Sequence, residues 1–276
     1  MTGSALTSMW AWDNPVLPSA DARGRAYEPA SVSSLVAFCT SRGLTRVFLS
    51  APWAADEGPV GDWFAAACST LHDASVQVSP LGGDPGWLGQ PSLAVTWALA
   101  AARSAALPDG VTVQLDVEPW TTPAWTSSRA LVVDQWLALL ALVGSSVAIG
   151  VDLPWWLAHE RYRDGTVLDA VLPLVSRVAV VAFADHAGGP SGVVSLAGPA
   201  VVAASAAGLP FTVGVETDTA QVAGGPQYTF ASAGPAALEA ETMVVRDAFG
   251  ELPGYEGVTV EHHRAWRRLL ALDPPS

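Results

Sequence analysis

The chain has 276 residues, of which 50% are hydrophobic and 14% are charged, so it can bury a large core. It contains 13 arginines, no lysine and 26 acidic residues, and the net charge of -13 argues against nucleic acid as a partner. The missing lysine also excludes Schiff-base aldolases, pyridoxal-phosphate enzymes and Walker-type nucleotide-binding loops.

Short valine-rich runs alternate along the chain with longer Ala/Leu stretches of helical period, a pattern typical of parallel strands joined by crossover helices. The expected strands, in chain order, are Ser8–Trp12, Arg46–Ser50, Val76–Pro80, Thr112–Asp116, Val147–Val151, Val178–Phe183, Phe211–Val215 and Gly257–Glu261. The expected helices are Ser31–Arg42, Asp62–His72, Leu93–Ala106, Ser128–Val143, Val167–Val175, Val194–Ala207, Pro235–Phe249 and Arg264–Leu272.

Eight such β-α units predict an α/β fold, a single (β/α)8 TIM barrel spanning residues 1–276. Pro29 stands just before the first helix and Gly43 just after it, as helix boundaries require. A doubly wound sheet is the competing architecture, and it usually carries a glycine-rich loop after its first strand. Here that position reads Asp13-Asn14-Pro15, which favours the barrel.

The cysteines and the N-terminal segment indicate in which cellular compartment we expect the protein. Cys39 and Cys68 lie in apolar, helix-like stretches, so we expect buried free thiols. Residues Met1 to Met9 lack the basic and apolar regions of a secretory signal, and no later run of about 18 apolar residues suggests a membrane span. We therefore expect a cytoplasmic protein with no membrane partner.

Acidic and histidine side chains follow most of the expected strands, where barrel enzymes carry their chemistry. They are Asp13, Asp116, Glu118, Asp152, Asp185, His186, Glu216, Asp218, Glu261, His262 and His263. A ring of carboxylates around one barrel mouth raises some pKa values. Its ligand should be cationic, hydroxyl-rich or bridged by a metal ion.

Some of these acids have a structural explanation. Asp84, Asp152 and Asp218 suit helix capping or loop solvation as well as function. Glu118 and Glu216, by contrast, directly continue apolar strands, which favours a functional role. Asp116 lies two residues before Glu118, so both side chains point the same way along an extended segment and can share one proton.

Tryptophan gives a second signal, because eight of the twelve lie at expected strand ends or in the loops that follow. Indole faces beside carboxylates suit the C–H face of a sugar or a cationic group. We expect the ligand site to contain, besides the acids above, Trp12, Trp53, Trp120 and Trp155, with Asp13, Asp152, Asp185, His186 and His262 as further substrate-binding residues.

The segment Asp116-Val117-Glu118-Pro119-Trp120, together with Glu216, resembles the glycoside hydrolase barrels of clan A. The resemblance implies that Glu118 is the acid/base and Glu216 the nucleophile, with their carboxyl groups about 5–5.5 Å apart. A weaker resemblance links Leu115-Asp116-Val117-Glu118 to family 18 chitinases. In that family the Glu protonates the leaving group and the neighbouring Asp supports an acetamido nucleophile.

The leading hypothesis is a glycoside hydrolase-like enzyme without a cofactor or metal, acting on a small sugar or glycoside through Glu118 and Glu216, with Asp116 tuning Glu118. Three alternatives remain. One is a biosynthetic enzyme that guides a cationic intermediate, and another is a non-catalytic sugar-binding barrel. The third is a metal-dependent lyase or isomerase, whose candidate ligands are Glu118, Asp152, Asp185, His186, Glu216 and His262.

Overall fold

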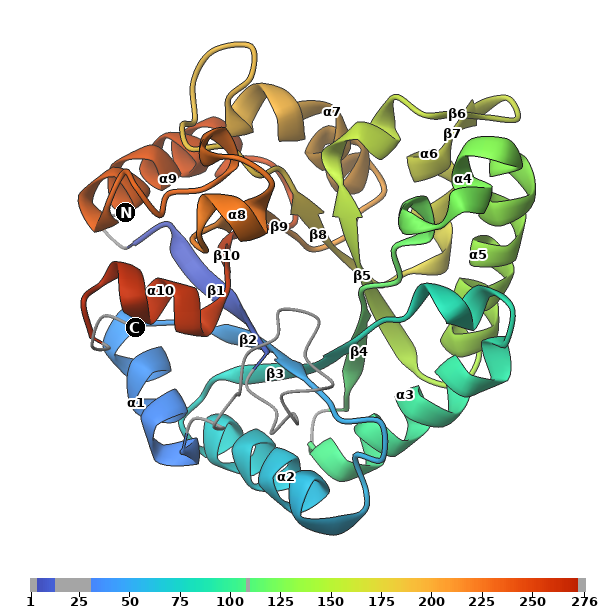
Figure 1. Ribbon diagram of the computed structural model, residues 1–276, viewed down its shortest axis with the longest axis horizontal. Helices are drawn as coiled ribbons and strands as arrows, with labels where there is room; N and C mark the ends of the chain where they lie inside the picture. Colours follow the sequence, from blue (N-terminus) through green and yellow to red (C-terminus); the bar gives the residue numbers. More distant parts are fainter. Residues whose placement is uncertain (1–3, 13–30, 108–109, 273–276) are drawn as a thin grey trace.

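In the computed structural model the chain forms a closed barrel of eight parallel strands (Figure 1). The structure describes residues 4–12, 31–107 and 110–272. Around the barrel the strands follow the order β1-β10-β9-β8-β5-β4-β3-β2. Their bounds are β1 Leu6–Ala11, β2 Arg46–Ser50, β3 Gln77–Gly82, β4 Thr112–Leu115, β5 Ala148–Pro154, β8 Arg177–Val181, β9 Phe211–Glu216 and β10 Tyr255–Glu261.

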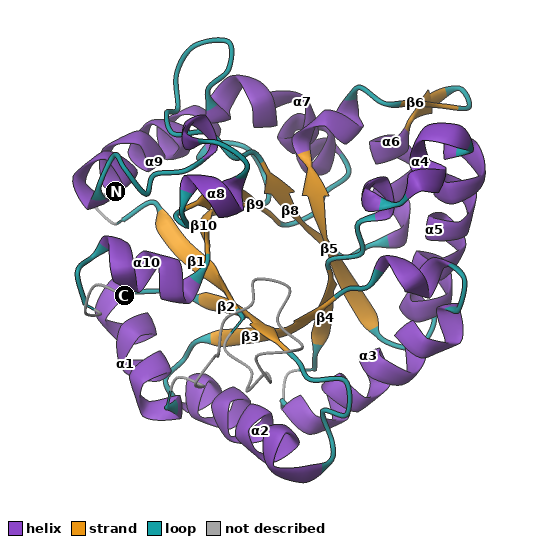
Figure 2. Cartoon of the chain, viewed as in Figure 1, coloured by secondary structure: helices purple, strands orange, loops and turns teal. Residues whose placement is uncertain are grey.

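Helices surround the barrel on its outside (Figure 2). Their bounds are α1 Val32–Arg42, α2 Gly58–Asp73, α3 Pro91–Ala105, α4 Pro123–Ser127, α5 Arg129–Gly144, α6 Val167–Val171, α7 Val193–Ala206, α8 Ala220–Ala223, α9 Pro235–Phe249 and α10 His263–Leu269. A short antiparallel hairpin, β6 Arg161–Tyr162 with β7 Gly165–Thr166, stands between β5 and α6. No helix within the described ranges is long and apolar enough to cross a membrane.

Local sequence signals set the helix ends. Ser31 caps α1 by accepting a hydrogen bond from the Ser34 backbone N–H, and Gly43 ends the helix in the left-handed conformation. Thr166 opens α6 through a capping box with Asp169. Pro173 cannot continue an α-helix, because it lacks the N–H donor for the backbone ladder.

The barrel interior is filled in layers. At the amino-terminal end of the strands, Glu256 pairs with Arg177 at 2.7 Å and with Arg46 at 3.8 Å. Trp10 and Phe48 fill the interior nearer the mouth, with ring centroids 5.8 Å apart. Because this interior is packed, the barrel is not a pore, and its open space lies at the carboxyl ends of the strands.

The predicted TIM barrel is confirmed, and the alternative of a doubly wound sheet is wrong. Some predicted boundaries are wrong: β3 continues to Gly82 and β5 to Pro154, because both strands extend into the mouth. The helix predicted over Val167–Val175 is broken at Pro173 into α6 and a 3-10 turn. The hairpin β6-β7 was not predicted. Both cysteines are buried thiols that form no disulfide, as expected.

Candidate active site

An acidic cavity of about 320 Å³ lies at the barrel mouth, where β1, β4, β5, β8, β9 and β10 end. We refer to it as the acidic cavity. The described residues that line it are Trp10, Trp12, Asp116, Glu118, Asp152, Val181, Phe183, Glu216, Val222 and Glu261. Every ionisable side chain in this set is an acid. The cavity is therefore an acidic environment in which each ionised carboxylate makes the ionisation of its neighbours less favourable.

Three of these acids perturb one another. Burial, and then the charge of Glu118, raise the pKa of Asp116 to about 7. Burial, followed by the charge of Asp116, also raises the pKa of Asp152 well above its ordinary value. The pKa of Glu118 is raised by burial, and a hydrogen bond with Trp120 opposes this increase. These three acids together therefore retain protons at a pH at which isolated carboxyl groups are ionised.

Indole N–H groups hold the carboxylates of the mouth in place. Trp10 Nε1 donates to Asp152 Oδ2 at 3.2 Å, and Gln114 Nε2 donates to the other oxygen of that carboxylate at 2.8 Å. Trp12 Nε1 donates to Glu261 Oε1 at 3.0 Å. The tryptophans near the acids were expected to offer their faces to a ligand. These contacts show that their N–H edges also orient the acids.

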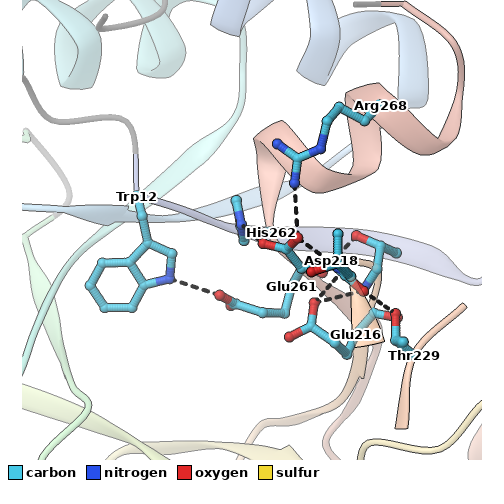
Figure 3. Close-up of polar contacts among 9 residues, drawn as sticks. Trp12, Glu216, Asp218, Thr229, Glu261, His262 and Arg268 are labelled. Carbon is cyan, nitrogen blue, oxygen red and sulfur yellow. Dashed lines mark hydrogen bonds and ion pairs between the residues drawn. The ribbon is translucent and has the colours of Figure 1, made fainter. Parts of the chain in front are cut away.

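Glu216 ends β9 and is 4% exposed. Its Oε1 accepts two hydrogen bonds at 2.7 Å, from the backbone N–H groups of Thr217 and Asp218. These donors stabilise a carboxylate and fix its direction. In the register of the sheet Glu216 lies beside Glu261 of β10, and both acids reach the mouth (Figure 3).

A buried ionic network supports this segment from behind (Figure 3). Asp218 is 2% exposed, and its Oδ2 lies 3.0 Å from Nε2 of His262. Arg268, from α10, donates to its Oδ1 at 2.9 Å. Burial alone would raise the pKa of Asp218, but the His262 hydrogen bond, the Thr219 N–H and the Arg268 charge bring it below the ordinary range.

The structure brings five of the predicted site residues together in the acidic cavity: Trp12, Asp116, Glu118, Asp152 and Glu216. The capping explanation for Asp152 is wrong, since this residue lies inside β5 and bonds across the barrel interior. It is right for Asp84, whose Oδ1 accepts from the Gly86 N–H.

Other predicted residues lie elsewhere. Asp185 and His186 pair with each other at 2.6 Å, are half-exposed, and are not part of the cavity lining. His262 is buried behind the mouth against Asp218, because β10 ends there and turns directly into α10. Asp13 lies outside the described residues.

The predicted tryptophans divide in the same way. Trp120 packs edge-to-face with Trp125, Trp136 and Trp156, and forms its hydrogen bond with Glu118. Trp155 packs against His159 and is absent from the cavity lining. Trp53 lines a neighbouring cavity.

Sequence reasoning missed several residues that line the acidic cavity: Trp10, Val181, Phe183, Val222 and Glu261. Trp10 could have been found from its spacing, because it lies two residues before Trp12 and so points to the same side of β1. Glu261 was recognised as a strand-end acid but not assigned to the site. Nothing in the sequence marked Val222, which comes from the short helix α8 after β9.

The described residues offer no group of three or more His, Cys, Asp or Glu side chains arranged to hold a metal ion. Cys68, a buried residue of α2, stays a protonated thiol at neutral pH, because burial raises its pKa to about 12.

No model of a known protein family matches the chain, and no curated protein matches it in sequence. Among solved structures, a class V chitinase from Pseudomonas fluorescens Pf-5 is similar with a TM-score of 0.53 and 13% identity. The match covers 96% of this chain and 98% of the chitinase. The two chains share the closed barrel fold described above.

Two further similar structures are the chitinase ChiB of Flavobacterium johnsoniae and the spore cortex-lytic enzyme SleL of Bacillus cereus. ChiB has a TM-score of 0.48 and 12% identity, with 96% of this chain and 89% of ChiB covered. SleL has a TM-score of 0.48 and 10% identity, with 78% of this chain covered. The chain spans about half the length of SleL, 52%. The predicted resemblance is confirmed at the level of the barrel fold, through the match to the Pseudomonas chitinase structure.

Proposed function

We propose that the protein is a glycoside hydrolase acting on a small sugar or glycoside, with Glu118 as general acid/base and Glu216 as nucleophile. The observation that carries the proposal is that one cavity contains two carboxyl groups in opposite environments. Glu118 has a raised pKa, whereas Glu216 accepts two backbone N–H groups at 2.7 Å. Such a difference is how two carboxyl groups take the separate roles of acid and nucleophile.

The reaction follows from this difference. Glu118 donates its proton to the glycosidic oxygen while a Glu216 oxygen attacks the anomeric carbon, and the bond to the leaving group breaks. Glu118, now a carboxylate, removes a proton from water, and that water displaces Glu216 from the sugar. Asp116 takes part as a neighbouring proton store, because burial and the charge of Glu118 raise its pKa to about 7, so that it holds a proton beside Glu118 up to near-neutral pH.

The proposed substrate class rests on the cavity lining. Trp12 supplies indole surface beside carboxylates, which suits a ring with C–H faces and hydroxyl groups. The similar Pseudomonas structure is named a chitinase, so glycosides of N-acetylated sugars belong in the first substrate panel. A second candidate function is the binding of an organic cation, which the described lining favours because each of its ionisable side chains is an acid.

The test is hydrolysis of a panel of para-nitrophenyl glycosides by the wild type and by the Glu118→Gln, Glu216→Gln and Glu251→Gln variants. Glu251 is an exposed acid on the turn after α9, so its variant is the matched control. We expect turnover to fall by at least about 100-fold in the first two variants and to stay unchanged in the control. A dinitrophenyl leaving group, which needs little protonation, should restore part of the Glu118→Gln activity.

Three outcomes would contradict the proposal. Full activity of Glu118→Gln would remove the acid/base role. Binding of sugars or cations without turnover by the wild type would indicate a binding protein. Loss of activity with a chelator, restored by Mg²⁺ or Mn²⁺, would indicate the metal-dependent lyase or isomerase.

A further inference from the structure

A second cavity, of about 490 Å³, adjoins the acidic cavity above β2 and β3. We call it the tryptophan cavity, because Trp12, Trp53, Trp87 and Trp97 all line it. Trp12 belongs to both cavities. Each volume falls in the range of about 300–1,000 Å³ that is usual for small-molecule sites.

The floor of the tryptophan cavity is fixed. Trp87 and Trp97 are buried, and their ring centroids lie 5.3 Å apart with a tilt of 36°. Trp97 Nε1 donates to the Ala51 backbone oxygen at 3.3 Å. A Cβ at Gly82 would lie 2.3 Å from Cζ2 of Trp97, so the glycine is what allows this ring to reach the floor.

Trp53 forms the exposed wall. Its exposed fraction is 53%, although an indole gains free energy when it is buried. A ligand placed against this ring would cover apolar surface that the folded chain leaves in water. The ring of Trp53 is therefore available for a ligand to stack against, next to the fixed floor formed by Trp87 and Trp97.

The two cavities are close enough for one ligand to occupy both. The Asp116 N–H donates to the Gly82 carbonyl oxygen at 3.0 Å, which joins the end of β3 to the acidic segment. A Cβ at Gly83 would lie only 1.8 Å from the Asp116 backbone oxygen, so the two segments are in direct contact. If one ring of a ligand binds beside Asp116, the adjoining ring of the same ligand therefore lies over the end of β3.

We propose that the tryptophan cavity binds a second sugar ring, so that the substrate is a glycoside of at least two rings. The inference rests on the proposed function for its first ring. Indoles cover the C–H face of a pyranose, while the exposed side chains of Asp84 and Gln90 in the lining offer hydrogen bonds to its hydroxyl groups. The described lining has no basic side chain, which disfavours an anionic group.

The first arm of the test compares para-nitrophenyl glycosides of one and two rings. The pairs are N-acetylglucosamine with N,N′-diacetylchitobiose, and glucose with cellobiose. Trp53→Ala should lower kcat/KM about 10-fold for the two-ring substrate and leave the one-ring substrate unchanged. Leu131→Ala, which removes another exposed apolar side chain on α5, is the control and should change neither.

The second arm measures binding by calorimetry in the Glu118→Gln background, so it needs no turnover. We expect the free disaccharide to bind about 10-fold tighter than its monosaccharide, and this advantage to vanish with Trp53→Ala. That result without any hydrolysis by the wild type would support the second-ring site and count against the proposed function. Equal affinity for one and two rings, no binding of either disaccharide, or an unaffected Trp53→Ala variant would overturn the inference, even where hydrolysis persists.

Discussion

Replacing Asp116 by asparagine should stabilise the folded protein at neutral and alkaline pH. Burial, and then the charge of Glu118, raise the pKa of Asp116 from 3.8 to about 7 in the folded state. Between these two values the native state keeps a proton that the unfolded chain has released. The free energy of unfolding therefore falls as the pH rises through this window, and an uncharged side chain removes that loss.

The magnitude follows from the two pKa values. The interval from 3.8 to about 7, at about 1.4 kcal/mol for each pKa unit, corresponds to about 4 kcal/mol. Water in the open cavity and the protons shared with Asp152 reduce this figure, so we expect a gain on the order of 1–3 kcal/mol at pH 8. Near pH 4 the carboxyl is largely protonated in the folded state, and the difference should shrink to about 0.5 kcal/mol or less.

The assay is urea unfolding of the wild type and Asp116→Asn at pH 4 and pH 8. Asp56→Asn is the control with the opposite sign, because a hydrogen bond from Arg103 lowers the pKa of Asp56. That variant should show no gain at pH 8. A variant Asp116→Asn that is less stable than the wild type at pH 8, or that differs equally at both pH values, would refute the reasoning. Its glycosidase activity should also fall.

Two further predictions concern the packing of the barrel. Gly83→Ala places a Cβ 1.8 Å from the Asp116 backbone oxygen, so thermal unfolding should show a loss of about 1–3 kcal/mol, whereas Gly188→Ala, with open space around it, should be nearly neutral. Glu256→Gln leaves the buried Arg177 without its carboxylate partner. Urea unfolding should show that the free energy of unfolding falls by about 1–3 kcal/mol, which is less than for a fully buried pair because Glu256 is partly exposed. An unchanged free energy of unfolding would mean that water already compensates the charge of Arg177.

Much of the fold was predictable because strands and helices have different periods. Apolar runs such as Arg46–Ser50 and Phe211–Val215 recur between helical stretches, and they form β2 and β9 of the parallel barrel. Some predicted strand ends were wrong because pairing with a neighbouring strand, which the local sequence does not show, extended the strand. The strand predicted over Val76–Pro80 continues to Gly82, because Leu81 and Gly82 pair with β4.

Part of the site was predictable for a related reason. Acids that directly continue apolar strands, such as Glu118 and Glu216, must emerge at the mouth of a parallel barrel. Side-chain partners were beyond reach, because they join residues far apart in the chain. Trp10 bonds to Asp152 across 142 positions, and no spacing rule relates them. For Asp185, the adjacent His186 supplied a partner away from the cavity.

The support behind Glu216 can be separated from Glu216 itself. The Asp218 N–H holds the Glu216 carboxylate, and the Asp218 side chain is in turn held by His262 and Arg268. Asparagine at position 218 keeps the backbone N–H but loses the charge that both partners require. We therefore expect a positioning effect, in which the nucleophile is present but less well directed.

Asp218→Asn should lower kcat more than it changes KM, because Glu216 acts in the transition state rather than in substrate binding. Stability gives a second readout. Since the pKa of Asp218 is lowered in the folded state, its contribution is present above about pH 4 and is lost as the pH falls further, so the variant should unfold more easily at pH 7 and converge on the wild type in acid. A stability loss of about 3 kcal/mol with unchanged kcat would assign the network to folding alone. A fall in kcat that Asp218→Glu partly restores would instead show that the charge behind Glu216 directs the nucleophile.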